Sequence, residues 1–329
     1  MEEKIQWHAI SPLPEIYEIL RQKRLSILLT IMFCVIGFIL IVSRKYIFTK
    51  KFLKSRFTLI CIITFAVLLV YASIEPFLLR FSYNEISIPN KSFKPFTAVH
   101  LSDLHLQWPY PYVNEKSMMK VVEKVNKINP DFIFVTGDLV SRYRSYNISL
   151  KNANSISRIL RSLKSKNGIY GVLGNNDLHA KQFVIDAWEN ANAKLLRQET
   201  IEVDGIKVSG IDPSKNFSIA RQHLEQLGNI DGDCLKILLG HEPDTAELSY
   251  KNGFDLQLSG HTHGGQCTIP FGIGPIFLPR MGKLFAAGLY QVKSMLLYVT
   301  KGVGISPLPK PLVRFNTFPE VSVLHIIPK

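Results

Sequence analysis

The sequence predicts a layered α/β domain preceded by a membrane-inserted helical hairpin, and three observations carry this prediction. Two long apolar runs without a charged residue lie within residues 1–80. From about residue 96, short apolar runs alternate with stretches whose apolar residues have helical spacing. A tight cluster of polar residues follows five of the short runs. We therefore divide the chain into an anchor over residues 1–80 and one large domain over residues 95–329.

The composition is that of a globular or membrane-linked protein. Of 329 residues, 47% are apolar and only 20 are Gly and 18 Pro, which excludes a collagen-like, low-complexity or disordered chain. Four cysteines cannot build a disulfide framework at this length, so a reducing compartment is favoured. The net charge of +13 raises nucleic acid as a partner. However, residues 1–80 hold 11 Lys or Arg against 5 Glu, so the basic excess is densest beside the apolar runs.

The two apolar runs span residues 25–43 and 57–74. With 19 and 18 residues, each is about long enough to cross a hydrocarbon core as a helix. The alternatives are a pair of buried core helices or, for the first run, a cleaved signal peptide, although that run lacks a small-residue cleavage site. We expect a transmembrane hairpin whose basic residues bind anionic headgroups, which makes a membrane the expected partner and not nucleic acid.

Charge does not decide the orientation of this hairpin. The loop between the runs carries six Lys or Arg, and the two flanks together also carry six. A hairpin places the N-terminus and the large domain on the same side of the membrane, so the tie leaves that side open.

The large domain is expected to contain βαβ units. Its expected strands cover residues 97–101, 131–135, 169–173, 234–239 and 255–258, and its expected helices cover residues 116–128, 155–163 and 182–189. Strands that alternate with helices indicate a layered α/β fold. In such folds ligands bind at the carboxyl ends of the strands, and all five polar clusters lie there.

The five clusters together supply seven candidate metal ligands. Taken alone, each cluster is typical of an ordinary turn, but Asp-x-His and His-x-His spacings point both side chains to the same side of an extended segment. Carboxylate, amide and imidazole donors suit Mn²⁺, Fe or Zn²⁺ better than thiolate-seeking metals. A shared carboxylate can bridge two ions about 3.5–4 Å apart, which suits in-line displacement at phosphorus. The seven residues are Asp103, His105, Asp138, Asn175, His241, His261 and His263.

These clusters resemble, in order and spacing, the five blocks of the calcineurin-like metallophosphoesterases. The blocks are Asp103-Leu104-His105, Gly137-Asp138, Gly174-Asn175-x-Asp177, Gly240-His241 and Gly260-His261-Thr262-His263. Later segments, at residues 264–266, 288–290, 298–304 and 314–320, are similar to the membrane-anchored bacterial branch of that family. The resemblance implies a four-layer α/β/β/α metallophosphoesterase sandwich as the catalytic domain over residues 95–329.

The resemblance also implies how the seven residues divide between two divalent metal ions, with Mn²⁺ the expected metal. Asp103, His105, Asp138 and His263 would hold one ion. Asp138, Asn175, His241 and His261 would hold the other, so that Asp138 bridges the two. Every ligand of the pattern is present, which disfavours a scaffold that has kept the fold and lost catalysis.

One position departs from the common pattern of the family. Asn176 replaces the His that is usually assigned as the acid for the leaving group. An alkoxide leaving group needs such an acid, whereas the phosphate released from an anhydride needs little protonation. The departure therefore favours a pyrophosphate substrate. His179 is a nearby substitute, but a solvent-exposed His at a helix start is the alternative reading.

A non-His residue here, together with the anchor and the basic charge, resembles the UDP-2,3-diacylglucosamine pyrophosphatases of lipid A biosynthesis, of the LpxG type. That resemblance implies a lipid-linked nucleotide substrate, lipid X and UMP as products, and a catalytic domain on the cytoplasmic side of a bacterial inner membrane. The alternative is another membrane-associated metal-dependent phosphodiesterase or phosphatase that acts on phospholipids or nucleotides.

Residues that would contact the substrate are less clearly marked in the sequence. Four arginines, Arg142, Arg144, Arg158 and Arg161, are candidates for the diphosphate, with solubilising surface charge as the alternative. Trp108 and Tyr110 would stack on the base or simply belong to a Pro-rich loop. The stretch 271–290 has few charges and would reach the membrane interface, or else form core and a stiff loop.

Overall fold

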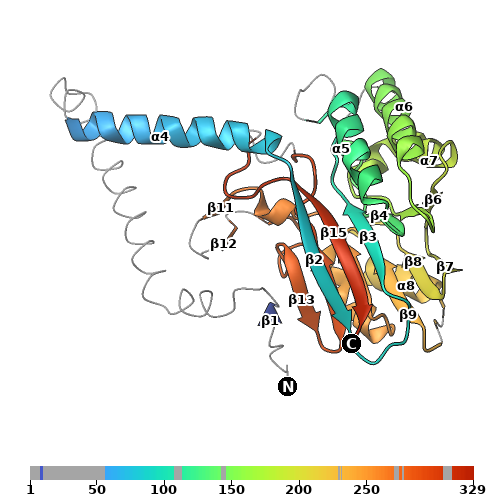
Figure 1. Ribbon diagram of the computed structural model, residues 1–329. Coiled ribbons are helices and arrows are strands. Elements are labelled where there is room, and N and C mark those ends of the chain that lie inside the picture. The colour runs from blue at the N-terminus through green and yellow to red at the C-terminus, as the bar shows by residue number, and fades with distance from the viewer. Residues whose placement is uncertain are drawn as a thin grey trace.

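The computed structural model describes residues 8–9, 56–106, 113–141, 146–228, 230, 232–269, 274–275, 278–306 and 313–329. Two mixed β-sheets pack face to face, and helices cover the outer face of each sheet (Figure 1). The chain is therefore an α/β sandwich, as the sequence predicts.

The first sheet has six strands, most of them parallel. Its central strands β3 to β6 run parallel, β15 is antiparallel to β3, and β2 is parallel to β15. In spatial order the strands are β2 (Arg80–Ile88), β15 (Glu320–Pro328), β3 (Phe96–Leu101), β4 (Phe132–Val135), β5 (Ile169–Gly171) and β6 (Lys194–Leu195).

The second sheet has seven strands around a parallel centre. Strands β14, β10, β9 and β8 run parallel, while β13 and β7 pair antiparallel at either side. In spatial order the strands are β1 (His8–Ala9), β13 (Gly288–Val292), β14 (Met295–Val299), β10 (Leu256–Ser259), β9 (Leu235–Leu239), β8 (Ile206–Gly210) and β7 (Glu199–Val203). A separate short ribbon joins β11 (Thr268–Ile269) to β12 (Gly274–Pro275).

Alternating side chains explain the four layers. In β4, Phe132 and Phe134 pack between the two sheets, while Ile133 and Val135 pack under the helices on the outer face. Because both faces of this strand are covered, its sequence reads as a continuous apolar run. The first sheet is covered by α5 (Glu115–Ile128), α6 (Tyr146–Ser162), η3 (Asp177–Ala180) and α7 (Lys181–Glu189), and the second by α8 (Phe217–Gln226), η4 (Pro243–Thr245) and α9 (Ala246–Lys251).

The second apolar run, predicted at residues 57–74, forms a helix, α4 (Arg56–Ile74), which continues into η2 (Glu75–Phe77). It extends away from the sandwich in Figure 1, and its apolar side chains are exposed, with Phe65 63% accessible. Residues Leu59–Phe77 are the one stretch among the described residues that is long and apolar enough to cross a membrane. The first apolar run, residues 25–43, lies outside the described residues, so the hairpin stays a prediction.

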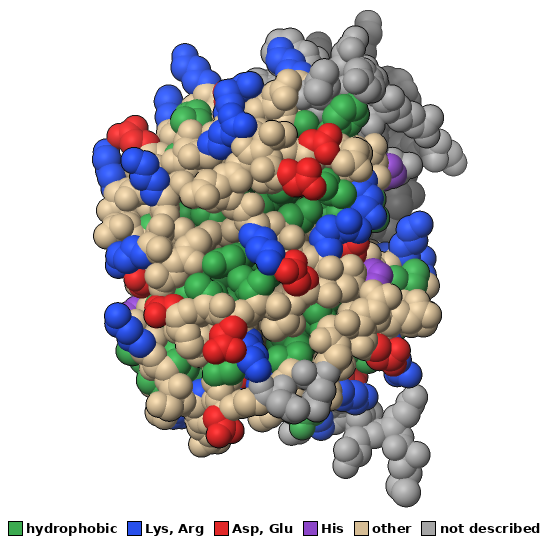
Figure 2. Space-filling view, turned by 90° about the vertical axis from the view of Figure 1, so that its right-hand side faces the viewer, with side chains coloured by type: hydrophobic (Ala, Val, Ile, Leu, Met, Phe, Trp, Pro, Cys, Tyr) green, Lys and Arg blue, Asp and Glu red, His purple; other side chains and the backbone are tan. Residues whose placement is uncertain are grey.

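Charged side chains are mixed on the face that Figure 2 shows. Lys and Arg side chains stand over this face with Asp and Glu side chains between them. A continuous basic stripe, which a nucleic-acid duplex needs, does not form on this face. The partner of the chain stays a prediction from the sequence.

Candidate metal centre

All seven predicted ligands come together at one end of the sandwich. Asp103 and His105 follow β3, Asp138 follows β4, and Asn175 follows β5 in the first sheet. The histidines His241, His261 and His263 follow β9 and β10 in the second sheet. The carboxyl ends of parallel strands thus meet across the two sheets, which is where such folds bind ligands.

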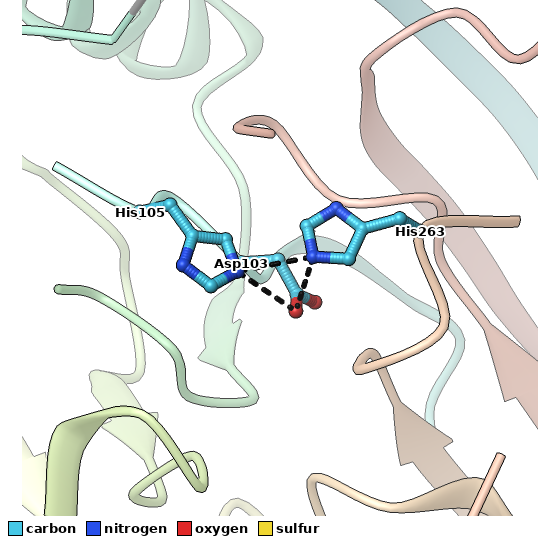
Figure 3. A group of neighbouring side chains, drawn as sticks. All are labelled: Asp103, His105 and His263. Carbon is cyan, nitrogen blue, oxygen red and sulfur yellow. Dashed lines mark hydrogen bonds and ion pairs between the residues drawn. The ribbon is translucent and has the colours of Figure 1, made fainter. Parts of the chain in front are cut away.

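One half of the centre consists of Asp103, His105 and His263. The Nε2 atoms of the two histidines lie 3.0 Å apart. Nε2 of His263 lies 3.3 Å and Nε2 of His105 3.8 Å from Oδ1 of Asp103 (Figure 3). All three side chains are buried, and Oδ1 of Asp103 has no hydrogen-bond partner. Two imidazole nitrogens and a carboxylate oxygen that converge in a buried site fit a divalent cation.

Asp138 joins this half to the other. Its Oδ2 atom lies 3.5 Å from Nε2 of His105 and 3.4 Å from Nε2 of His241. Nε2 of His241 in turn lies 3.1 Å from Oδ1 of Asn175 and 3.2 Å from Nδ1 of His261. One carboxylate therefore faces two groups of donors, as a bridging ligand must. The structure brings together every residue of the predicted set.

The backbone at these residues is held in an uncommon conformation. Five of the seven have a positive φ, between 44° and 70°. Non-glycine residues adopt this region rarely, and such residues cluster at functional sites. The left-handed conformation turns each side chain off the end of its strand and into the centre. These residues are Asp103, His105, Asp138, His261 and His263.

Two glycines of the motif allow the ligands to approach one another. A Cβ at Gly174 would lie 2.2 Å from Oδ1 of Asp138, and a Cβ at Gly260 would lie 2.2 Å from Oδ2 of Asp103. Any side chain at either position would collide with a carboxylate of the centre. Glycine is therefore required for packing here and not for turn geometry.

Outer hydrogen bonds orient the histidines and the bridging carboxylate. Nδ1 of His241 lies 2.7 Å from the carbonyl oxygen of Thr136, and Nε2 of His261 lies 2.7 Å from that of Arg280. If each ring donates there, its other nitrogen is left free for a metal. Asn176 donates to Asp138 from both its backbone N–H (2.7 Å) and its side-chain amide (2.6 Å).

The pKa values of the ligands differ with their surroundings. Burial lowers the pKa of His105, of His263 and, to about 4, of His261, so these rings are neutral and ready to bind a cation. Burial also acts to lower the pKa of His241, but Asp138 outweighs it and raises that pKa. Burial raises the pKa of Asp138 less than His241 and His105 lower it, so its net pKa falls well below the usual value.

Two buried carboxyls behind the ligands were not assigned a role from the sequence. Asp177 accepts from the backbone N–H groups of Gly174 and Val140, and burial followed by Asp138 raises its pKa to about 7. Burial likewise raises the pKa of Glu242 to about 7. Asp177 was part of a recognised block, but only the fold reveals that it holds the loop that carries Asn175.

The structure places some of the candidate substrate residues away from the seven ligands, and others lie outside the residues that it describes. Arg158 forms an ion pair with Glu115 (2.5 Å) and Arg161 donates to the carbonyl oxygen of Asn190, both beside a groove of about 390 Å³ at α6 and α7. None of the seven ligands lines this groove.

His179, the candidate substitute for the missing acid, is exposed at η3. Of the stretch 271–290, residues 274–275 and 278–290 are described, and Leu284 is 53% accessible. Arg142, Arg144, Trp108 and Tyr110 lie outside the described residues.

Comparison with known proteins agrees with the geometry. Residues 96–265 match the calcineurin-like phosphoesterase family. An uncharacterized metallophosphoesterase of Bacillus subtilis, YkuE, is 31% identical over 77% of this chain and 87% of its own. A zebrafish transmembrane protein with a metallophosphoesterase domain is 29% identical over 77% of this chain and 60% of its own. The Escherichia coli phosphodiesterase YaeI is 27% identical over 71% of this chain and 83% of its own.

Proposed function

The chain belongs to the calcineurin-like phosphoesterase family, and from this premise we propose that it hydrolyses the pyrophosphate bond of UDP-2,3-diacylglucosamine. The products are 2,3-diacylglucosamine 1-phosphate (lipid X) and UMP, in lipid A biosynthesis. The coarser activity, metal-dependent phosphoester hydrolysis, follows from the family and from the candidate metal-binding residues. The pyrophosphate bond, the uridine nucleotide and the acylated sugar are the finer part of the proposal.

In this proposal each ligand keeps the place that the family resemblance implies. Asp103, His105 and His263 would hold one divalent ion, Asn175, His241 and His261 would hold the other, and Asp138 would contribute to both; Mn²⁺ is the proposed metal. When bound, such a pair of ions lowers the pKa of a water toward neutrality and neutralises charge on the phosphoryl oxygens. The task of the chain is then to hold the donors in place and to position the scissile phosphorus over them.

The observation that carries the choice of a pyrophosphate is the place of Asn176. Its backbone N–H and its side-chain amide each donate to Asp138, and an amide cannot supply a proton to a leaving group. A substrate whose leaving group is a phosphate needs no strong acid, whereas a phosphomonoester that releases an alkoxide does. The residue thus positions the bridging carboxylate and leaves the reaction to substrates with good leaving groups.

A lipid-linked substrate suits the surroundings of the centre. The exposed apolar helix α4 ends at the same end of the sandwich, and Phe77 and Leu78 just beyond it are 54% and 43% accessible. An anchor that crosses the membrane would hold the centre at the bilayer surface, where a substrate with two acyl chains resides. Because uridine nucleotides are cytoplasmic, the proposal places the catalytic domain on the cytoplasmic side of a bacterial inner membrane.

The contacts to the diphosphate are also proposals. Arg142 and Arg144 follow the bridging Asp138 closely in sequence, and a guanidinium fork suits phosphate oxygens. Arg158 and Arg161 are weaker candidates, since Glu115 and the backbone at Asn190 already occupy them.

A second candidate function is hydrolysis of a phosphodiester or phosphomonoester in another membrane-associated lipid or nucleotide. The observation that favours a diester is the similarity to a relative that is named a phosphodiesterase. A diester would use the same metal ligands. A diester that releases an aryl oxide also depends little on an acid, because that leaving group needs little protonation.

One assay separates the two candidates. The full-length chain in detergent with Mn²⁺ is given UDP-2,3-diacylglucosamine in one arm and bis(p-nitrophenyl) phosphate in the other. UMP release in the first arm is the expected result. Asp138→Asn should abolish activity in both arms, and Asp233→Asn, at an exposed position, serves as the matched control. Cleavage of the diester without release of UMP would reject the lipid-nucleotide substrate in favour of the second candidate.

A further inference from the structure

The last turn of α4 is fastened to a loop that lies far away in sequence, residues 313–317. The carbonyl oxygen of Ala72 accepts from the backbone N–H of Arg314 (3.1 Å). The carboxylate of Glu75, which is fully buried, accepts from the backbone N–H groups of Asn316 (2.8 Å) and Thr317. A carboxylate that accepts two backbone N–H bonds in a buried site holds that loop firmly.

We call the contact between residues 71–75 and residues 313–317 the seam, and aromatic packing adds to it. The ring of Tyr71 on α4 meets the ring of Phe315 edge to face, with centroids 5.8 Å apart. Phe315 is in turn paired with the chain that leaves the metal centre, because its N–H donates to the carbonyl of Gln266 (3.0 Å) and its carbonyl accepts from Thr268 (2.9 Å). The same short loop therefore touches the anchor helix on one side and the segment after His263 on the other.

Arg314 extends this seam to the first half of the metal centre. Its guanidinium is fully buried, and its Nη2 lies 3.2 Å from Nδ1 of His263. The hydrogen bonds of this guanidinium go to a ring of backbone carbonyls, so that one planar group holds several chain segments at once. These carbonyls belong to Lys301 (2.9 Å), Gly302 (3.2 Å), Gly304 (2.5 Å), Thr317 (3.1 Å) and His263 (3.5 Å).

Residues 302–304, whose glycine carbonyls Arg314 binds, also contact the backbone at Asp103. The N–H of Gly304 donates to the carbonyl of Asp103 (2.7 Å), and the N–H of Val303 donates to that of Ser102 (3.0 Å). A Cβ at Gly302 would lie 2.6 Å from Cβ of Asp103, which shows how closely the two segments pack. Arg314 thus stands between His263 and the segment that supports Asp103.

The charge of Arg314 is balanced by the groups around it. Burial lowers its pKa to about 10, while Asp103, Glu75 and Glu320 oppose that effect, so the guanidinium is charged at neutral pH. A buried charge is tolerated only when it is paired and hydrogen-bonded. Glu75 therefore contributes twice, through the loop that it holds and through its negative charge.

From these contacts we infer that Glu75 and Arg314 are positioning residues that couple the anchor helix to the first half of the metal centre. The seating of α4 on residues 313–317 sets the placement of Asp103 and His263, and with it the affinity of that half for its divalent ion. The anchor is then part of the metal-binding framework in addition to being a tether. This inference rests on the proposed divalent-metal centre but not on the identity of the substrate.

The second half of the centre provides an internal comparison. The outer partners of its rings are the carbonyls of Thr136 for His241 and of Arg280 for His261, and neither residue belongs to the seam. Loosening the seam should therefore lower the affinity for one of the two metal ions selectively. A general loss of stability would lower the affinity for both.

The test is a Mn²⁺ titration of the full-length chain in detergent, in which the EPR signal of the free ion reports binding. Glu75→Gln removes the charge at constant shape, and Glu75→Ala removes the acceptor. Glu85→Ala, at an exposed acidic residue of β2, is the matched control. We expect both Glu75 variants to lower the affinity for one of the two Mn²⁺ ions by roughly 10–100-fold, as loss of a hydrogen bond behind a metal ligand does. The weakened step should be the one that His263→Ala also removes.

Arg314→Lys gives a second, independent reading. A lysine keeps the charge but cannot serve several carbonyls in one plane, so the same selective loss of one Mn²⁺ is expected. Wild-type Mn²⁺ affinity in the Glu75 variants or in Arg314→Lys would overturn the inference. So would an equal loss of both ions that follows a lower melting temperature. Since Mn²⁺ binding is measured without a substrate, a failure to release UMP would count against the proposed function alone.

Discussion

The two halves of the metal centre differ in how deeply the fold encloses them. Asp103, His105 and His263 are all buried, and Arg314 with the loop at residues 302–304 backs them from behind. In the other half, His241 is buried but Asn175 and His261 are only half-buried. From this difference we expect the enclosed half to bind its ion more tightly and the open half to face the substrate.

Four experiments would break or sharpen this comparison, and the largest effect is expected at the residue that both halves share. Asp138→Asn removes the negative charge that faces His105 and His241. Phosphoester hydrolysis should fall on the order of 1,000-fold or more, because the two-ion arrangement that activates water would be lost. Steady-state kcat/KM with bis(p-nitrophenyl) phosphate measures it. Near-normal activity in a folded variant would mean that Asp138 does not bridge.

The next effect distinguishes the halves from one another. His263→Ala should remove the tighter Mn²⁺ ion, with a larger loss than the roughly 10–100-fold of an outer contact, whereas His261→Ala should affect the weaker ion. Calorimetric titration with Mn²⁺ gives both affinities for each variant. If the two variants weaken the same binding step, the halves are not separate sites.

The pH dependence of binding offers a finer contrast. Asp138 raises the pKa of His241 above 6.5 in the metal-free chain, so at pH 6 that ring holds a proton which a metal must displace. The affinity for the second ion should therefore rise with pH, by up to about tenfold per unit where one proton is released, and level off above the raised pKa.

The first ion should depend less on pH over the same range. Burial lowers the pKa of His105 and His263, so their rings are already neutral at pH 6. Mn²⁺ titrations between pH 6 and 8, with a dye that reports released protons, measure both ions. A steeper pH dependence for the tighter ion would contradict the assignment of the two halves.

The smallest effect concerns the open half and its missing acid. Asn176→His restores the residue that the common family pattern has at this position. We expect kcat/KM for an alkyl phosphomonoester such as glycerol 3-phosphate, whose alkoxide leaving group needs a proton, to rise about tenfold, below the roughly 10²–10⁴-fold that a well-placed acid gives. Asn176→Ala is the control, because it also loses the side-chain bond to Asp138 but adds no acid. An equal rise in both variants would show that acid catalysis is not the cause.

Much of the fold was readable from local patterns. The apolar run at residues 131–135 and the helical spacing at residues 116–128 predict β4 and α5 to within a residue. The structure adds that Asn114 and Ser117 cap that helix. The helix expected at residues 155–163 begins earlier, at Tyr146. The sequence does not predict its first turns because their apolar residues Ile148 and Leu150 are two positions apart, which is not a helical spacing. The strand β15, which lies between β2 and β3, has no local signal for its partners.

The candidate site shows the same limit. The seven candidate ligands follow strand ends at short, recognisable spacings, so the sequence alone could single out residues that the fold then brings together. Glu75 and Arg314 have no such signal, because Glu75 and Asn316, which it binds, are 241 residues apart in the chain. An isolated Glu at the end of an apolar run and an isolated Arg in a late loop read as ordinary charges. Only tertiary contact reveals that Glu75 holds the loop that contains Arg314 and that Arg314 lies beside His263.

The central claim is that Asp138 lies between two metal ions, and the EPR spectrum of the Mn²⁺-loaded full-length chain tests it most directly. We expect two Mn²⁺ ions per chain with an exchange-coupled spectrum, which Asp138→Asn should convert to uncoupled signals. A single six-line spectrum from one tightly bound Mn²⁺ per chain, unchanged by Asp138→Asn, would contradict the bridged centre.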